Sequence, residues 1–191
     1  MSIILTKKSI AMKKITSLIC LLIVSLYINA QTAASLNSKG FKQAKKGNYE
    51  KAIKFFTRAL DRNNFYTDAF YNRALAYSYL KKYDLAISDY SCAIQIRPDF
   101  KAAYNNRGAD KIELKDPAGA VRDCSKAIEL DSLYAMAYYN RGIAQMHLKE
   151  YDLAIADFDK ALLIQPAYKE AVINLAVALK RKGELMVLRS L

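Results

Sequence analysis

The chain has 191 residues, of which 53% are apolar and 25% charged, and its formal net charge is +12. This length fits a single domain, and the composition supplies a buried core, which argues against a chain too polar to fold. The positive charge suits an acidic partner or surface if the basic residues are grouped.

Residues 1–30 have the organisation of a secretory signal peptide. Four lysines precede an apolar run at residues 15–28, which is shorter than the roughly 18 apolar residues of a membrane span. Ala30 follows as a small residue suited to cleavage. We predict cleavage after Ala30 and export to the periplasm or the medium. An uncleaved membrane anchor is the alternative, and either Met1 or Met12 can be the true start.

Removal of residues 1–30 lowers the formal charge from +12 to +8, because four lysines and no acidic residue leave. Two cysteines remain, Cys92 and Cys124, which are too few for a disulfide framework. They fall at different angular places on their helices, so we expect neither a bridge nor a metal site. Cys124 takes a place that is aromatic in other copies, and we expect it to be buried.

A phrase recurs along the chain at an interval of 34 residues. It reads AFYNRALAY from Ala69, AYNNRGADK from Ala103, AYYNRGIAQ from Ala137 and AVINLAVAL from Ala171. A fixed period of this length is typical of stacked-repeat proteins. The chain then divides into copies at 33–66, 67–100, 101–134 and 135–168, with a shorter fifth piece at 169–191.

Each copy predicts two antiparallel helices. Apolar residues recur three and four apart both in the first phrase and in a second one, such as YDLAISDYSCAI from Tyr83. Asp116 followed by Pro117 is a favourable helix start, and Pro98 and Pro166 end the second and fourth copies.

Small residues indicate where the helices cross closely. They share the eighth, twentieth and twenty-seventh places of the copies. These residues are Gly40, Ala74, Gly108, Gly142 and Ala176; Ala52, Ala86, Ala120 and Ala154; and Ala59, Ala93, Ala127 and Ala161. One helix pair cannot bury its own apolar face, so we expect neighbouring copies to stack.

A 34-residue helix–turn–helix unit with these marks resembles the tetratricopeptide repeat (TPR). The resemblance covers essentially all of residues 33–191 and implies an all-α fold. The expected architecture is a right-handed α-solenoid of antiparallel helix pairs, the TPR superhelix, with four repeats and a capping helix at 169–191. The family's leucine place departs from the pattern, because it holds Lys39, Arg73, Arg107 and Arg141.

The three arginines of this place have acidic counterparts sixteen residues later, which are Asp89, Asp123 and Asp157. The first copy lacks both, since it has Lys39 and Phe55 there. We therefore predict structural ion pairs, either within a repeat or with the next one, because a partly buried charge needs a partner. An arginine ladder that holds an anionic ligand is the alternative.

The resemblance also implies a concave surface lined by the first helix of each repeat. Tyrosine, methionine and asparagine side chains there suit a peptide, and we expect them to lie outside the core. A solvated groove without a ligand is the alternative. The predicted groove residues are Tyr71, Asn72, Leu75, Tyr79, Asn105, Asn106, Ala109, Ile112, Met136, Tyr139, Asn140, Ile143, Met146, His147 and Asn174. Some tetratricopeptide domains grip chaperone C-termini with a clamp of lysines, asparagines and an arginine. We do not expect this clamp here, because only Asn72 matches it when the clamp is placed from the first copy onward, and only Asn106 when it is placed from the second.

The basic charge lies at the two ends. Residues 31–66 carry a net charge of +6 and residues 169–191 carry +3, whereas the three copies between them are close to neutral. Solvated terminal repeats explain this pattern. Contact with an acidic partner or an anionic envelope surface is the alternative, and nucleic acid is not expected.

No catalytic motif stands out. His147 is the only histidine and has no serine or cysteine placed with it, and the six glycines are scattered. We therefore expect that the protein is not an enzyme and that it binds no cofactor or metal.

The predicted function is a binding module for a protein or peptide partner in an envelope or secreted complex. Self-assembly, suggested by the apolar end at 185–191, and an accessory role at an enzyme or cell-wall polymer are the alternatives.

Overall fold

The computed structural model describes the backbone of residues 2–189 and the side chains of residues 16–183. Over the described backbone the chain consists of nine helices and the turns between them, so the all-α fold is confirmed. The helices belong to two compact units, Met1–Ala69 and Phe70–Leu191, which are described one after the other. The apolar end at 185–191 lies outside the described side chains.

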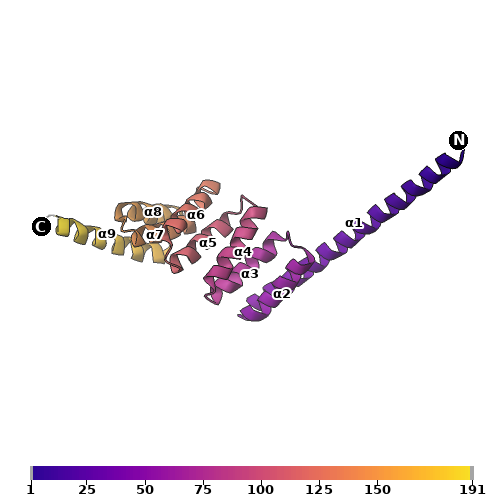
Figure 1. The fold of residues 1–191 in the computed structure, drawn as a ribbon. Coiled ribbons are helices and arrows are strands. Elements are labelled where there is room, and N and C mark those ends of the chain that lie inside the picture. Colours follow the sequence, from indigo (N-terminus) through magenta and orange to yellow (C-terminus); the bar gives the residue numbers. More distant parts are fainter. Residues whose placement is uncertain (1, 190–191) are drawn as a thin grey trace. The chain divides into compact units, whose positions relative to one another are not determined.

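The first unit contains α1 (Ser2–Ala44) and α2 (Tyr49–Arg62), which pack against each other (Figure 1). Phe56 of α2 is fully buried at their crossing. A Cβ atom added to Gly40 would lie 2.5 Å from Cε1 of Phe56. A side chain at this place would push α1 and α2 apart, which is why the place is held by a small residue.

Residues 18–28 of α1 are largely apolar and exposed. Its segment Thr16–Ala44 contains an 18-residue window with a mean hydropathy of 1.7 and, among the residues searched, is the one helix that by length and composition is able to cross a membrane. A signal sequence near the N-terminus has the same properties. The predicted cleavage point, Ala30, lies in the interior of this helix.

The second unit is a row of paired helices (Figure 1). Each helix from α4 onward packs against the one that follows it, and the first helices α5, α7 and α9 also contact one another in turn. The helices are α3 (Thr67–Tyr79), which begins in the first unit, α4 (Tyr83–Ile96), α5 (Lys101–Glu113), α6 (Pro117–Leu130), α7 (Ala135–His147), α8 (Tyr151–Ile164) and α9 (Lys169–Arg189).

The turns inside the repeats share one backbone conformation. Lys81, Lys115 and Lys149 have φ values of 57°, 60° and 61°, and Gly47 at the same place of the first copy has 77°. A left-handed residue at this point lets the chain reverse after one helix and begin the next. Glycine is the residue that adopts this conformation without strain, whereas the three lysines bear a modest cost.

The predicted helix boundaries near proline are confirmed. The Asp116 side chain accepts a hydrogen bond of 2.8 Å from the backbone N–H of Gly119 and so caps α6. Helices α4 and α8 end two residues before Pro98 and Pro166.

The core of the second unit is built from the small residues and the large side chains that face them. Ala74 packs against Tyr90, and both are fully buried. In the fourth repeat glycine replaces the alanine, and a Cβ atom on Gly142 would lie 2.7 Å from Cε1 of Phe158. Cys124 is fully buried as expected.

Candidate functional site

Three arginine–aspartate pairs lie inside the repeats. In each pair the guanidinium donates two hydrogen bonds of 2.6–2.8 Å to both carboxylate oxygens, the bidentate arrangement that is strongest for this pair of groups. The aspartates are buried, with 5% of their surface exposed. The pairs are Arg73–Asp89, Arg107–Asp123 and Arg141–Asp157, and each joins the two helices of a single repeat.

Two of these arginines also reach the preceding repeat. Arg107 donates through Nη1 to the hydroxyl of Ser91 at 2.9 Å, and Arg141 donates in the same way to Ser125 at 3.0 Å. Each guanidinium lies over the aromatic ring three residues earlier, 5.6 Å from the ring centroid. With these donors engaged in the packing, the geometry disfavours an arginine ladder that holds an anionic ligand.

A second set of side-chain hydrogen bonds connects neighbouring first helices. In each of them an asparagine Nδ2 donates to a side-chain oxygen 35 residues earlier, at 2.9 Å. The three bonds run from Asn106 to Tyr71 Oη, from Asn140 to Asn105 Oδ1 and from Asn174 to Tyr139 Oη. We call them the asparagine ladder. Three of the amides predicted to bind a peptide main chain, those of Asn106, Asn140 and Asn174, therefore donate a hydrogen bond to the adjacent repeat.

Two predicted groove tyrosines are partly core residues. Tyr71 packs against Tyr90 and Phe100, with ring centroids 5.8 and 4.7 Å apart. Tyr139 packs in the same way against Phe158 and Tyr168, at 5.9 and 4.8 Å. The expectation that aromatic side chains at these places lie outside the core is wrong for Tyr71 and Tyr139, because the closing aromatic residue of each repeat covers them.

Asn105 is a further correction. Its side chain is fully buried, and it both accepts from Asn140 and donates to Asn106 Oδ1 at 3.0 Å. It replaces the tyrosine found at this place in the neighbouring repeats and fills the same space with hydrogen-bonding groups. It therefore has no surface to offer a ligand.

Other predicted groove residues lie at the surface. Tyr79 and Met136 expose 67% and 47% of their area, and His147 is also exposed. Leu75, Ala109, Ile112, Ile143 and Met146 are half-buried, as is Asn72. We define the groove surface as the residues named in this paragraph, which are predicted for it and lie on α3, α5 and α7 with exposed or half-buried side chains: Asn72, Leu75, Tyr79, Ala109, Ile112, Met136, Ile143, Met146 and His147.

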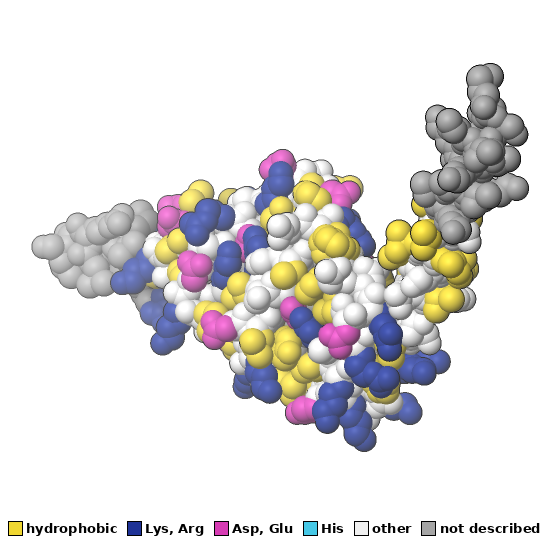
Figure 2. All heavy atoms as spheres, turned by 45° about the vertical axis from the view of Figure 1, so that its right-hand side comes forward, with side chains coloured by type: hydrophobic (Ala, Val, Ile, Leu, Met, Phe, Trp, Pro, Cys, Tyr) yellow, Lys and Arg dark blue, Asp and Glu magenta, His cyan; other side chains and the backbone are white. Residues whose placement is uncertain are grey.

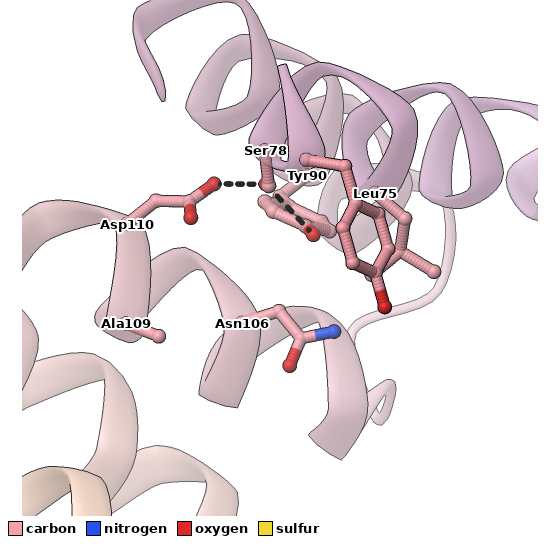
Figure 3. A pocket seen from close by; sticks show the side chains of 7 residues that line it. Leu75, Ser78, Tyr90, Asn106, Ala109 and Asp110 are labelled. Carbon is pink, nitrogen blue, oxygen red and sulfur yellow. Dashed lines mark hydrogen bonds between the residues drawn. The ribbon is translucent and has the colours of Figure 1, made fainter. Parts of the chain in front are cut away.

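A pocket of about 250 Å³ opens between α3, α4 and α5 (Figure 3). Its lining combines four predicted groove residues with others that the sequence analysis did not name as groove residues. The lining residues are Leu75, Ser78, Tyr79, Tyr90, Asn106, Ala109 and Asp110. In Figure 3 the Ser78 hydroxyl stands between the Asp110 carboxyl and the Tyr90 hydroxyl.

Asp110 is the unusual group of this pocket. It exposes only 6% of its surface and accepts a hydrogen bond of 2.5 Å from the Ser78 hydroxyl. Burial raises the pKa of Asp110 to about 6; the Ser78 hydrogen bond opposes this rise and the negative charge of Glu113 adds to it.

The sequence itself marks this site. Asp110 stands at the tenth place of its repeat, where the neighbouring first helices have the buried alanines Ala76, Ala144 and Ala178. An acidic residue at a buried alanine place departs from the packing pattern and points to a special role.

The basic residues of the first unit form a surface of their own. Figure 2 shows dark-blue side chains gathered on the part of the molecule below the apolar α1 segment. All eight are exposed: Lys39, Lys42, Lys45, Lys46, Lys51, Lys54, Arg58 and Arg62.

Comparisons with known proteins agree with this architecture. A family model described as tetratricopeptide repeat matches residues 67–100 and 135–168, and a second model of the same description matches residues 33–66. An uncharacterized protein of Methanocaldococcus jannaschii is 40% identical over 58 residues, which are 30% of this chain and 67% of that protein.

Two solved structures are similar over most of their length. The crystal structure of MamA protein has a TM-score of 0.74 at 23% identity and covers 80% of this chain and 84% of its own. The structure of PilW, described as a widely conserved type IV pilus biogenesis factor, has a TM-score of 0.73 at 27% identity and covers 81% and 72%.

Proposed function

Because the chain belongs to the tetratricopeptide repeat family, we propose that it is a non-catalytic scaffold that holds a segment of a partner protein on its groove surface. The observation that carries this proposal is the pocket beside Tyr79, which gives the surface of the first helices a defined recess. Repeat proteins of this kind use the surface of their first helices for binding.

The residues around the pocket support a peptide ligand. Tyr79 and Met136 offer exposed aromatic and thioether surface, which binds varied partners at low entropic cost. The asparagine ladder aligns α3, α5, α7 and α9, so the groove surface is continuous along three repeats. A preorganised surface loses less entropy when it binds.

A capture experiment with two matched variants tests the groove surface. In the full-length chain, we expect the double variant Tyr79→Ala/Met136→Ala to retain about one tenth or less of the amount of partner protein that the parent captures from an envelope extract. The control, Leu153→Ala/Leu163→Ala, removes exposed apolar side chains from α8 and should retain the partner. Tyr71 and Tyr139 are left intact because their loss would disturb the core.

Mass spectrometry identifies the retained proteins, and circular dichroism confirms that each variant is folded. Equal retention by both variants would contradict binding at the groove surface. Retention of further copies of this chain alone would favour self-association instead.

We also propose that the scaffold works in the cell envelope. The apolar, exposed residues 18–28 of α1 support export, and the likeness to the pilus biogenesis factor PilW supports an envelope location. We expect the exported chain to begin at Gln31, after cleavage behind Ala30. N-terminal sequencing of the chain from an envelope fraction checks this, and an intact N-terminus held in the membrane would favour the anchor.

Self-association is the second candidate function, and α9 carries it. The side chains of Val172, Ile173, Val177 and Leu179 expose 41–63% of their area on this last helix, where no further repeat covers them among the described residues. Such a patch favours contact with another apolar surface. Sedimentation at rising concentration should then show larger species that Ile173→Asp abolishes, and a constant size would exclude the contact.

A further inference from the structure

The Asp110 carboxyl lies in the pocket without a counter-charge. Within the described part of the chain no lysine or arginine contacts it, and the one charged group that acts on it is Glu113, which has the same sign. By contrast, the three buried aspartates of the second helices, Asp89, Asp123 and Asp157, each have a bidentate arginine. A buried carboxylate without a cation is costly, so this site departs from the charge pairing of the rest of the unit.

We propose that this pocket receives the side-chain ammonium of a lysine from the bound partner segment, an inference that rests on the proposed function. The carboxylate supplies the opposite charge. The Ser78 oxygen lies beside the carboxylate and the Tyr90 oxygen lies beside Ser78, and both line the pocket as further acceptors for an ammonium, which donates three hydrogen bonds.

The geometry favours lysine over arginine. Oδ2 of Asp110 already accepts the hydrogen bond from Ser78, so a guanidinium that forms two parallel bonds would have to share this oxygen with Ser78, whereas Oδ1 has no such partner among the described side chains. An ammonium is a compact charge that needs only one carboxylate oxygen. Leu75, Ala109 and Tyr79 supply apolar walls for the methylene stem of a lysine.

The size of the pocket fits one side chain. Its volume of about 250 Å³ is below the roughly 300–1,000 Å³ typical of pockets for drug-sized ligands. Tyr79 stands exposed at this site, and an aromatic ring close to an ammonium adds a favourable cation–π contact.

Two unusual residues meet to form this site. Serine stands at the twelfth place only in Ser78, since the other copies have Ala44, Ile112, Met146 and Lys180 there. Asp110 is the one aspartate at the tenth place. The pocket therefore recognises its side chain at one point of the groove surface, which would set the register of the bound segment.

Peptide selection tests the inference. A library of random 12-residue peptides is selected on the full-length chain in mild detergent, and selected peptides are synthesised with lysine, arginine or norleucine at each lysine position. Fluorescence anisotropy gives the dissociation constants for the parent, for Asp110→Asn and for Glu113→Gln, which removes the same charge from an exposed site one turn further on α5.

We expect the selected peptides to share one lysine. Its replacement by norleucine should weaken binding to the parent about tenfold or more, and the arginine peptide should also bind more weakly. Asp110→Asn should bind the lysine and norleucine peptides equally, whereas Glu113→Gln should still prefer lysine. This coupling between one lysine and one aspartate is the supporting result.

Other outcomes overturn the inference in distinguishable ways. The ammonium pocket would be excluded if the selected peptides bound the parent equally well with lysine and with norleucine, or if Asp110→Asn and Glu113→Gln showed the same preference. Either result would leave the proposed groove function intact. Equal binding of arginine would exclude the assignment to lysine. If no peptide is selected on the parent, the proposed function fails together with this inference.

Discussion

Asp123→Asn is expected to lower the free energy of unfolding by about 3 kcal/mol, because it breaks a buried ion pair by removing one partner. Asp123 serves two cations, Arg107 at 2.6 Å and Lys111 at 2.8 Å, and both are mostly buried, with 17% and 20% of their side chains exposed. Asparagine keeps the shape of the side chain but leaves both positive charges without a counter-ion. Urea denaturation followed by circular dichroism measures the loss.

Two comparisons make this prediction specific. Asp157→Asn leaves only Arg141 without its partner, so it should cost less than Asp123→Asn. Glu129→Gln removes the exposed pair with Lys126 and should cause no measurable loss. Equal effects of the three variants would contradict the assignment of the buried pairs as the main electrostatic contribution to stability.

Asp110→Asn is expected to have the opposite effect and to stabilise the fold at neutral pH by roughly 1–2 kcal/mol. Burial raises the pKa of Asp110 to about 6, whereas an aspartate in the unfolded chain titrates near 3.9. Between about pH 4 and pH 6 the folded chain thus holds a proton that the unfolded chain has released. The stability of the parent therefore falls as pH rises through this window, and asparagine removes the fall.

The difference between parent and variant isolates Asp110 from the other titrating groups. The groups that interact with it are Ser78 from α3, Tyr83 and Tyr90 from α4 and Glu113 from its own helix. Denaturation at pH 4 should give similar stabilities for both chains, and at pH 7.5 the variant should be more stable. An unchanged difference at the two pH values, or a less stable variant at pH 7.5, would contradict the raised pKa.

Together the two aspartates show how differently one residue type acts in neighbouring helices of this fold. Asp123 has cations on two sides and supports the stack. Asp110 has none among the described residues and is expected to cost stability, a pattern found where a residue serves binding rather than folding.

Much of the fold follows directly from the sequence, because the same packing contacts recur wherever the sequence repeats. The 34-residue period, the small residues at helix crossings and the proline positions all reflect contacts that recur in each copy, so one interpretation applies to all of them. The sequence also paired each arginine with an aspartate but left open which repeat supplies the partner. The structure places the aspartate in the same repeat and adds a serine from the preceding one for Arg107 and Arg141.

The candidate site was harder to predict, because its residues act across repeats. Asn106 and Asn140 looked like surface amides, but the next helix along the stack brings an acceptor to each of them. Asp110 stands in a charged stretch of sequence, and within a single copy nothing distinguishes it from a surface carboxylate. Its burial depends on how α3, α4 and α5 meet, which the pattern within a single copy does not reveal.

The asparagine ladder has a consequence for how such a chain changes its length. Every rung joins residues 35 positions apart, so a duplication or deletion of one whole 34-residue segment leaves each donor facing an equivalent acceptor. Recombination between the copies can thus lengthen or shorten the array without new contacts. The Ser78–Asp110 pair does not share this tolerance, because each partner occurs once, in a different copy. A deletion of either copy would leave a folded array that has lost its pocket.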